Sequence, residues 1–492
     1  MGEAIDGLPV QVSRWSSDSV EDIFVVNNPA TGKPITAVQG GGPAEVDGAV
    51  RAAHAAFNEH WRWLPSRERG LLLVEASRTL REHTDELARL ECQENGKPLL
   101  QAFIDVEMCV ASFEYFGALI GNLPERFIDL GAIHCDVWLE PYGVVAGILP
   151  FNWPPIHAAG KAAPALAVGN TVVLKPGEQA PLTVLRIVEL LQKVMPRDVI
   201  HAVPGNGPAT GKALASHPLV RRISFTGATA TGASVLKLAA ENITPTFVEL
   251  GGKNPLLIFE DADLEAAVLG AIEGAFYNQG EACTAASRIL VQNPLHDQVV
   301  ERLSEAVSRI RMGNGADPTT HMGPLVTRQQ QTRVLDYIEI GKKEGAIIAA
   351  QGNLPEDPAL KDGFFVPPTL FTGVRHDMSI AREEIFGPVT CVIPFTDDDE
   401  AISIANGTDY GLVAAVYTRS QERALKTARR LDAGIVYINN YFRGGMGAPF
   451  GGTKASGFGR EHSIETLYEY GWSKAVRQPS GLGVVPQWRI DW

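Results

Sequence analysis

The sequence predicts an α/β protein whose first large unit is a parallel, doubly wound sheet. Four short β-rich runs are separated by helical segments, and strands that alternate with helices are typical of parallel sheets covered by helices. A second alternation after Gly252 predicts another α/β lobe, in a chain of 492 residues that can bury a large core. The four predicted strands cover residues 171–175, 199–203, 222–226 and 246–250, and the clearest intervening helices cover 181–194 and 231–242.

A helical region precedes the first sheet. Between residues 45 and 120, apolar side chains recur at helical spacing on a polar background. The pattern changes at Val137 to short β-branched runs, so we expect residues 143–149 to form the first buried strand.

The second lobe is predicted from three helices and two strands. The helices are expected near 264–279, 296–311 and 328–344, and the strands near 389–395 and 434–438. The acidic run 397–400 precedes a further helical segment. We interpret it as negative charge favoured at a helix N-terminus, and not as a metal site.

Composition excludes several classes of protein. The chain has 43 Lys and Arg against 57 Asp and Glu, a net charge of −14 without a basic block, which argues against a nucleic-acid partner. Its apolar runs are much shorter than the ~18 residues that a membrane span needs. The five cysteines are scattered without metal-ligand spacing, and the first residues lack the pattern of a targeting signal. We therefore expect a cytoplasmic protein with no metal site, no membrane contact and no disulfide framework.

Polar and glycine-rich turns follow three of the predicted strands, at the edge where parallel sheets bind ligands. They contain the pair Lys175 and Glu178, then Gly205, and then the turn from Thr226 to Gly232. A turn of this kind that leads into a helix can hold a pyrophosphate on its backbone N–H groups, although turns in any α/β protein also use glycine.

Three residues stand out as chemistry-bearing. Cys283 lies in a segment of small residues just after a predicted helix, unlike the other four cysteines, which we interpret as core residues. Glu249 ends an apolar strand, where a carboxylate is unexpected unless it serves a site. Asn152 follows another strand, where an amide can donate to a developing oxyanion.

Seven motifs, spread over about 300 residues, follow one another in the order that is typical of the aldehyde dehydrogenase superfamily. Because of these motifs, the sequence strongly resembles that superfamily over nearly the whole chain. The motifs are Pro150-Phe151-Asn152-Trp153, Lys175 with Glu178, Phe225-Thr226-Gly227, Glu249-Leu250-Gly251-Gly252-Lys253, Gly280-Glu281-Ala282-Cys283, Glu384-Ile385-Phe386-Gly387-Pro388 and Pro449-Phe450-Gly451-Gly452.

The resemblance implies a Rossmann-like cofactor domain, an α/β catalytic domain and a small β oligomerisation arm. The cofactor domain would comprise residues 1–127 and 141–252, the catalytic domain 253–460, and the arm 128–140 and 461–492. We expect a homodimer or homotetramer. The arm and the aromatic residues near the C-terminus, which we expect to be exposed, would form the interface; the alternative is that these aromatic residues cover the core. These aromatic residues are Tyr468, Tyr470, Trp472, Trp488 and Trp492.

On the matching positions, the resemblance implies that Cys283 is the nucleophile and Glu249 the general base. Asn152 and the backbone N–H of Cys283 would form the oxyanion hole. Because an aldehyde has no leaving group except hydride, a thiohemiacetal on the cysteine would lose hydride to the nicotinamide and become a thioester, which water then hydrolyses. Lys161 and Glu461 match positions proposed to help move protons.

The resemblance also implies the cofactor residues. Lys175 and Glu178 would hold the adenine ribose, and Glu384 and Phe386 the nicotinamide end. A carboxylate that accepts from the 2′-hydroxyl repels a 2′-phosphate, so we expect NAD and not NADP. Ala228 departs from the family, which frequently has serine there. The other predicted cofactor positions are Gly205, Thr226, Gly227, Ala228, Gly232 and Leu250.

The substrate is predicted to be a small-molecule aldehyde that is aromatic or otherwise bulky. Gly160 stands where the family often has a bulky aromatic residue, so it leaves room in the substrate tunnel. An alternative is a semialdehyde acid whose remote carboxylate is bound by Arg443. The candidate tunnel residues are Trp153, His157, Gly160, Tyr277, Phe442, Arg443 and Phe450.

Three rival functions remain at this stage. A CoA-acylating relative would use CoA in place of water, but such enzymes usually lack the base. A catalytically silent structural protein would have lost the catalytic residues. A Cys-His hydrolase would need a histidine beside Cys283, for which His157 is the candidate.

Overall fold

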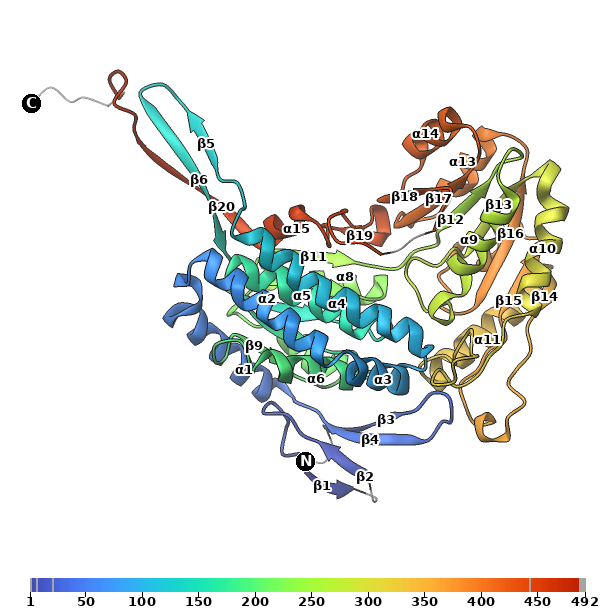
Figure 1. Cartoon of the computed structure of the whole chain (residues 1–492), viewed down its shortest axis with the longest axis horizontal. Helices are drawn as coiled ribbons and strands as arrows, with labels where there is room; N and C mark the ends of the chain where they lie inside the picture. The colour runs from blue at the N-terminus through green and yellow to red at the C-terminus, as the bar shows by residue number, and fades with distance from the viewer. Residues whose placement is uncertain (1, 6–7, 20–21, 442–443, 486–492) are drawn as a thin grey trace, which may run out of the picture.

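The computed structural model describes residues 2–5, 8–19, 22–441 and 444–485. The chain begins with four strands that the sequence analysis does not predict. They form one sheet in the order β1-β2-β4-β3 at one end of the molecule (Figure 1). The bounds are β1 Gly2–Ile5, β2 Leu8–Gln11, β3 Ile23–Asn27 and β4 Pro34–Gln39.

The predicted helical region is confirmed as four α-helices. Helices α2 and α4 approach each other closely at two glycines, because a Cβ on Gly70 would lie 2.4 Å from the carbonyl oxygen of Gly117. A side chain at this crossing would therefore separate the helices. The bounds are α1 Pro43–Glu59, the short η2 Trp61–Trp63, α2 Ser66–Glu82, α3 Thr84–Asn95 and α4 Leu99–Ile120.

The first large sheet has six strands in the order β19-β11-β10-β7-β8-β9. The five strands other than β19 are parallel, which confirms the predicted doubly wound sheet and its strands. β19 comes from much later in the chain and pairs antiparallel with β11 through Val248 and Phe458. The strands are β7 Val144–Ile148, β8 Thr171–Lys175, β9 Ile200–Ala202, β10 Val220–Thr226, β11 Thr246–Glu249 and β19 Gly457–Phe458.

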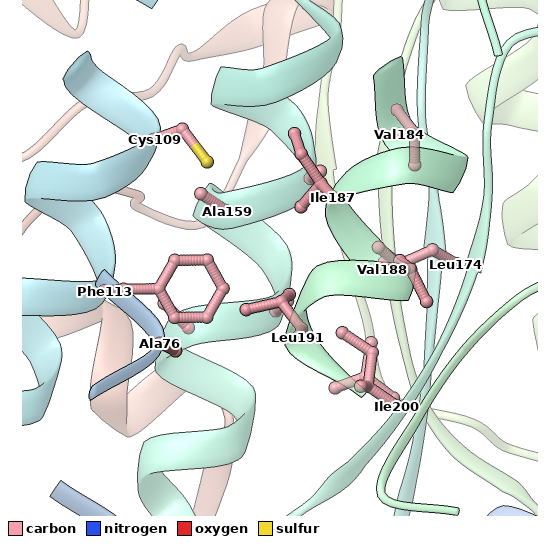
Figure 2. Close-up of a cluster of buried hydrophobic side chains, with 14 of the residues drawn as sticks. Ala76, Cys109, Phe113, Ala159, Leu174, Val184, Ile187, Val188, Leu191 and Ile200 are labelled. Atoms are coloured by element: carbon pink, nitrogen blue, oxygen red, sulfur yellow. The ribbon is translucent and has the colours of Figure 1, made fainter. Parts of the chain in front are cut away.

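Helices cover this sheet and enclose its main hydrophobic core. Figure 2 shows part of this core, where Phe113 of α4 points toward Leu191 of α6 and Ala159 of α5 lies between these helices. All three side chains are buried. The helices are α5 Pro154–Val168, α6 Leu182–Leu191, the π-helix η3 Gly207–Gly211, α7 Lys212–Ala215 and α8 Thr229–Glu241.

The second lobe is built on a seven-stranded sheet in the order β14-β15-β16-β13-β12-β17-β18. The strands predicted at 389–395 and 434–438 are confirmed as β16 and β18. The other five were not predicted. Of these, β12, β13 and β17 are fully buried runs without the alternation that separates strand from helix. The seven are β12 Pro255–Ile258, β13 Arg288–Gln292, β14 Ile347–Gln351, β15 Thr369–Thr372, β16 Val389–Phe395, β17 Val413–Tyr417 and β18 Ile435–Ile438.

The three helices predicted for this lobe are confirmed as α9, α10 and α11, although α10 ends at Ser308, whereas α12 and α14 were not predicted. The helix predicted over 264–279 ends at Phe276 and continues only as a short turn. The acidic run behaves as predicted, since the side chain of Asp397 accepts from the backbone N–H of Glu400 at the start of α13. The helical elements are α9 Leu264–Phe276, η4 Tyr277–Gly280, η5 Asn293–Leu295, α10 His296–Ser308, α11 Arg328–Lys343, η6 Pro358–Leu360, α12 Ser379–Arg382, α13 Asp398–Asn406, α14 Gln421–Arg430 and η7 Lys454–Ser456.

A three-stranded ribbon in the order β20-β6-β5 projects from the body of the molecule (Figure 1). Trp138 and Trp472 on this ribbon are each 41% exposed, and Phe127 is 64% exposed. The prediction that Tyr470 is exposed is wrong: it is fully buried, with its ring edge-on to Phe247. Trp488 and Trp492 lie outside the described residues. The bounds are β5 Arg126–Asp129, β6 Ile133–Pro141, α15 Ile464–Glu469 and β20 Gly471–Pro479.

The predicted fold class is confirmed, with a parallel-sheet α/β domain, a second α/β domain and a small β arm. Within the described ranges, none of the helices is both long and apolar enough to span a lipid bilayer.

Candidate active site

A cavity of about 610 Å³ is lined by residues of both large lobes. From the first sheet it receives side chains that follow the carboxyl ends of β7, β10 and β11, where ligands of parallel sheets bind. From the second lobe it receives the turn after α9 and the segment before β16. The residues that matter most for chemistry are Asn152, His157, Thr226, Leu250, Cys283 and Glu384.

A sharp left-handed turn presents Cys283 to this cavity. Asn278, Gln279 and Gly280 all have positive φ angles, 53°, 57° and 70°. A Cβ on Gly280 would lie only 2.2 Å from the carbonyl oxygen of Gly387, so this position requires glycine. The turn follows the end of α9 at Phe276 and directs the chain into the cavity, where Cys283 is half-buried.

Asn152 lies beside Cys283 in the same cavity and is held from both sides. Its side-chain Nδ2 donates to the carbonyl oxygen of Glu281 at 3.0 Å. Its own carbonyl oxygen accepts from Lys97 Nζ at 2.9 Å and from Asn278 Nδ2 at 3.1 Å. An amide fixed in this way leaves its second N–H for an oxyanion on a substrate bound to the cysteine.

Lys97 belongs to a buried charge cluster that the sequence analysis missed. Its side chain is fully buried and contacts Glu91 Oε1 at 2.7 Å and the carboxylate of Asp105. The signal in the sequence is that Glu91 and Asp105 stand at positions that the helical patterns of α3 and α4 assign to the buried face, with Lys97 between the two helices. The cluster therefore connects the helical layer to the backbone of Asn152.

Glu249 is buried at the end of β11. Neither carboxylate oxygen has a hydrogen-bond partner in the part of the chain that the structure describes. A Cβ on Gly451 would lie 2.7 Å from Glu249 Oε1, so this glycine makes space for the carboxylate. Burial, and then the nearby Glu461, raise the pKa of Glu249 far above its usual value, so this carboxylate binds a proton more tightly than an exposed one does. Glu249 is not among the described residues that line the cavity of Cys283.

Lys161 and Glu461 form a buried ion pair next to this carboxylate. Lys161 Nζ lies 3.0 Å from Glu461 Oε1 and 2.7 Å from Thr226 Oγ1. Burial pushes the pKa of Glu461 upward, but Lys161 and two histidines hold it below its usual value. Because Thr226 lines the cavity, the pair connects the surroundings of Glu249 to the cavity wall.

The first turn of α8 is suited to bind a phosphate. Gly227, Ala228 and Thr231 line the cavity, and no side chain in the described structure caps the N-terminus of this 13-residue helix. Its first backbone N–H groups are therefore available to an anion, and the helix dipole favours negative charge there. These residues fit the pyrophosphate of a dinucleotide.

The other predicted cofactor residues have different surroundings. Lys175 Nζ pairs with Glu178 Oε2 at 2.8 Å, and the Glu178 side chain is 40% exposed. Glu384 lines the cavity and accepts from the backbone N–H of Gly252 at 3.0 Å, while burial raises the pKa of its carboxyl group to about 7. Phe386, with a φ of 61°, places its ring edge-on to Phe151 in the same cavity.

Gly205 and Gly232 are not among the described residues that line the cavity. Gly205 packs against Gly41 and Thr210, and a Cβ on Gly232 would lie 2.5 Å from the side chain of Leu250. Both glycines allow close packing of the cofactor domain.

The substrate residues that the structure describes surround the start of α5 and residue 461. Trp153 precedes α5, and its ring lies 6.4 Å from that of His157. A Cβ on Gly160 would meet only Glu461 Oε2 and His462 Nε2, both at 3.9 Å. Phe450 packs its ring 5.3 Å from His462, and Tyr277 is half-buried at the start of η4. Phe442 and Arg443 lie outside the described residues.

Comparisons with known proteins agree with the resemblance seen in the sequence. A family model described as the aldehyde dehydrogenase family matches residues 15–476. The aldehyde dehydrogenase citD of Monascus ruber is 55% identical over 475 residues, which cover 96% of this chain and 95% of that protein. An aldehyde dehydrogenase of Didymella fabae is 50% identical over 478 residues, 97% of each chain. The crystal structure of betaine aldehyde dehydrogenase from Staphylococcus aureus in complex with NAD⁺ has a TM-score of 0.92 at 37% identity, covering 95% of this chain and 94% of that one. The chain therefore belongs to the aldehyde dehydrogenase family.

Proposed function

We propose that this aldehyde dehydrogenase oxidises a ring-bearing or otherwise bulky aldehyde to its carboxylic acid with NAD, through a thioester on Cys283. The observation that carries the proposal is that Cys283, Asn152 and the N-terminus of α8 share one cavity. A nucleophile, an oxyanion donor and a phosphate seat are thereby available to one substrate and one dinucleotide.

In the proposed reaction, Cys283, Asn152 and Glu249 have separate roles. The Cys283 thiolate bonds to the aldehyde carbon, and the oxygen that becomes negative accepts from the side-chain N–H of Asn152. NAD, which the N-terminus of α8, Glu384 and Phe386 would hold, would supply the acceptor for the hydride of the substrate carbon. Glu249 takes a proton from water as the water attacks the thioester, which releases the acid and the Cys283 thiolate.

Proton removal from Glu249 has a route in this scheme. The buried Glu461 lies near enough to raise the pKa of Glu249, and it is paired with Lys161, which also contacts Thr226. We assign this chain of groups the transfer of the proton from Glu249 toward the cavity.

The preference for NAD over NADP is assigned to Glu178. Its carboxylate is paired with Lys175 and is 40% exposed. A 2′-phosphate beside such a carboxylate is disfavoured by like charge. Glu384 and Phe386 are assigned to the nicotinamide end, since both line the cavity with Cys283.

Exposed aromatic residues on the ribbon support a homodimer or homotetramer. Phe127, Trp138 and Trp472 would be covered in such an assembly, as large exposed apolar patches usually are. We also propose a cytoplasmic location, which is consistent with five scattered cysteines, four of them buried.

An aldehyde panel with the purified full-length protein tests the proposal. Formation of NADH should be fastest with ring-bearing aldehydes, should need no CoA, and should be slower when NADP replaces NAD. A protein that is fastest on acetaldehyde would contradict the proposed substrate class, and a strict requirement for CoA would contradict hydrolysis of the thioester.

A further inference from the structure

His157 is a buried polar side chain with an unmet hydrogen bond in the active-site cavity. It lies on α5, is 8% exposed and lines the same cavity as Cys283 and Asn152. Its Nε2 has no hydrogen-bond partner among the described residues. Buried polar atoms in proteins are nearly always paired, so this nitrogen calls for a partner that a bound molecule supplies.

The imidazole is neutral in these surroundings. Burial, and then the positive charge of Lys161, lower the pKa of His157 to about 3. The adjacent His462 is half-buried, and desolvation likewise lowers its pKa. A neutral imidazole beside the Glu461 carboxylate does not attract a substrate carboxylate. It can hydrogen-bond a neutral polar group.

A hydroxyl group is the neutral partner that fits either form of the ring. In a neutral imidazole, Nε2 either donates or accepts, depending on the tautomer. A hydroxyl group can do both, whereas a ketone oxygen can only accept. The tautomer of His157 therefore does not change this conclusion.

His157 lines the cavity between apolar and polar neighbours. Behind it, the buried ring of Trp153 lies 6.4 Å from the His157 ring, centroid to centroid. Gly160, on the next turn of α5, adds no side chain, and the groups facing it are Glu461 Oε2 and His462 Nε2. A ring bound in the cavity beside Cys283 and Asn152 can thus direct a polar substituent to His157.

We propose that His157 is a specificity-determining residue that hydrogen-bonds a hydroxyl group on the substrate ring, so that hydroxylated aromatic aldehydes are the favoured substrates. This inference rests on the proposed function, in which a ring-bearing aldehyde reaches Cys283. It adds to that function the polar group that the enzyme recognises.

Matched substrates and two variants test the proposal. The kcat/KM values are measured with NAD for the ortho, meta and para hydroxybenzaldehydes and for the matching methylbenzaldehydes, with wild type, His157→Leu and His157→Gln. For at least one isomer, the hydroxyl-to-methyl ratio should fall about tenfold in His157→Leu, the size expected for one lost hydrogen bond. His157→Gln, which keeps a donor and an acceptor, should restore part of the ratio. Comparison between variants cancels the different intrinsic reactivities of the two aldehydes.

Unsubstituted benzaldehyde is the control substrate. Its kcat/KM should fall less in His157→Leu than that of the hydroxybenzaldehyde isomer whose ratio falls, because benzaldehyde has no hydroxyl group to lose. A ratio that is the same in wild type and both variants for all three isomers would overturn the inference. If His157→Leu does not fold, an unchanged ratio in His157→Gln together with a wild-type ratio near one for every isomer would overturn it as well. Failure of the proposed function looks different, since the wild type would then be fastest on short aliphatic aldehydes whatever the ratio.

Discussion

Lys97→Met should lower stability and activity together, because one ammonium group serves a buried charge cluster and the backbone of Asn152. Lys97 Nζ contacts Glu91, Asp105 and the carbonyl oxygen of Asn152. Methionine keeps most of the aliphatic volume but has no N–H donor. The substitution therefore isolates the charge and its hydrogen bonds.

The size of both effects follows from these contacts. Removing one partner of a buried ion pair costs about 3–5 kcal/mol, and we expect the free energy of unfolding to fall by this amount. The carbonyl oxygen of Asn152 keeps its bond from Asn278, so catalysis should suffer less than the ~100- to 1000-fold that follows deletion of an oxyanion donor. We expect a fall in kcat of about tenfold.

The stability loss should depend on pH. Burial raises the pKa of both Glu91 and Asp105, and Lys97 opposes the rise. Without Lys97 the folded-state pKa values rise further above their unfolded values. A group with a raised folded pKa favours folding most below its unfolded pKa, and this contribution is lost as pH rises through the folded pKa. The deficit of Lys97→Met relative to wild type should therefore be smaller near about pH 5 than at about pH 8.

Urea unfolding followed by circular dichroism at several pH values measures this deficit. Lys426→Met is the matched control, because Lys426 forms an exposed pair with Glu422 and its loss should leave the free energy of unfolding nearly unchanged. A deficit for Lys97→Met as small as that of the control, or one that grows toward acidic pH, would refute the reasoning.

Three further predictions concern cofactor, substrate and assembly. Glu178→Ser should raise the ratio of kcat/KM for NADP to that for NAD by about tenfold or more. The control Glu189→Ser, on the surface of α6, should leave this ratio unchanged. An unchanged ratio in Glu178→Ser would contradict the role assigned to this carboxylate. Gly160→Trp should lower kcat/KM about 100-fold for benzaldehyde and much less for short aliphatic aldehydes. Gly160→Ala, whose Cβ meets nothing closer than 3.9 Å, should leave the preference for benzaldehyde over aliphatic aldehydes intact. An equal loss of kcat/KM on all substrates would argue against a tunnel at this position. Light scattering should give two or four times the mass of one chain, and a stable monomer at micromolar concentration would argue against the assembly.

The sequence predicted those helices and strands whose periodicity and turn residues lie within the segment itself. The helices between residues 45 and 120 and the strands β8 to β11 follow from periodicity and turn residues within each segment. The four N-terminal strands were not predicted, because they are only four to six residues long and most of β3 is half-buried. The turn after α9 packs Gly280 against Gly387, more than 100 residues away, and no local pattern contains that contact.

Part of the candidate site could also be predicted, because some of its residues stand in local sequence motifs. Cys283, Glu249 and Asn152 stand in short motifs, so their neighbours in the sequence identify them. The role of Lys97 depends on partners that tertiary packing brings together, namely Asp105 on the next helix and the carbonyl oxygen of Asn152. Tyr470 was wrongly predicted as exposed, because aromatic residues near it in the sequence are exposed while its own ring packs on Phe247.

The central claim is that Cys283 carries the acyl group and Glu249 removes it, and trapping the acyl-enzyme tests it most directly. Glu249→Gln is mixed with NAD and benzaldehyde, quenched in acid after the first turnover, digested and analysed by mass spectrometry. The account predicts a burst of about one NADH per active site, slow turnover afterwards, and a benzoyl group in place of the thiol hydrogen on the peptide that contains Cys283. A burst that leaves this peptide unmodified, or a benzoyl group on another residue, would contradict it.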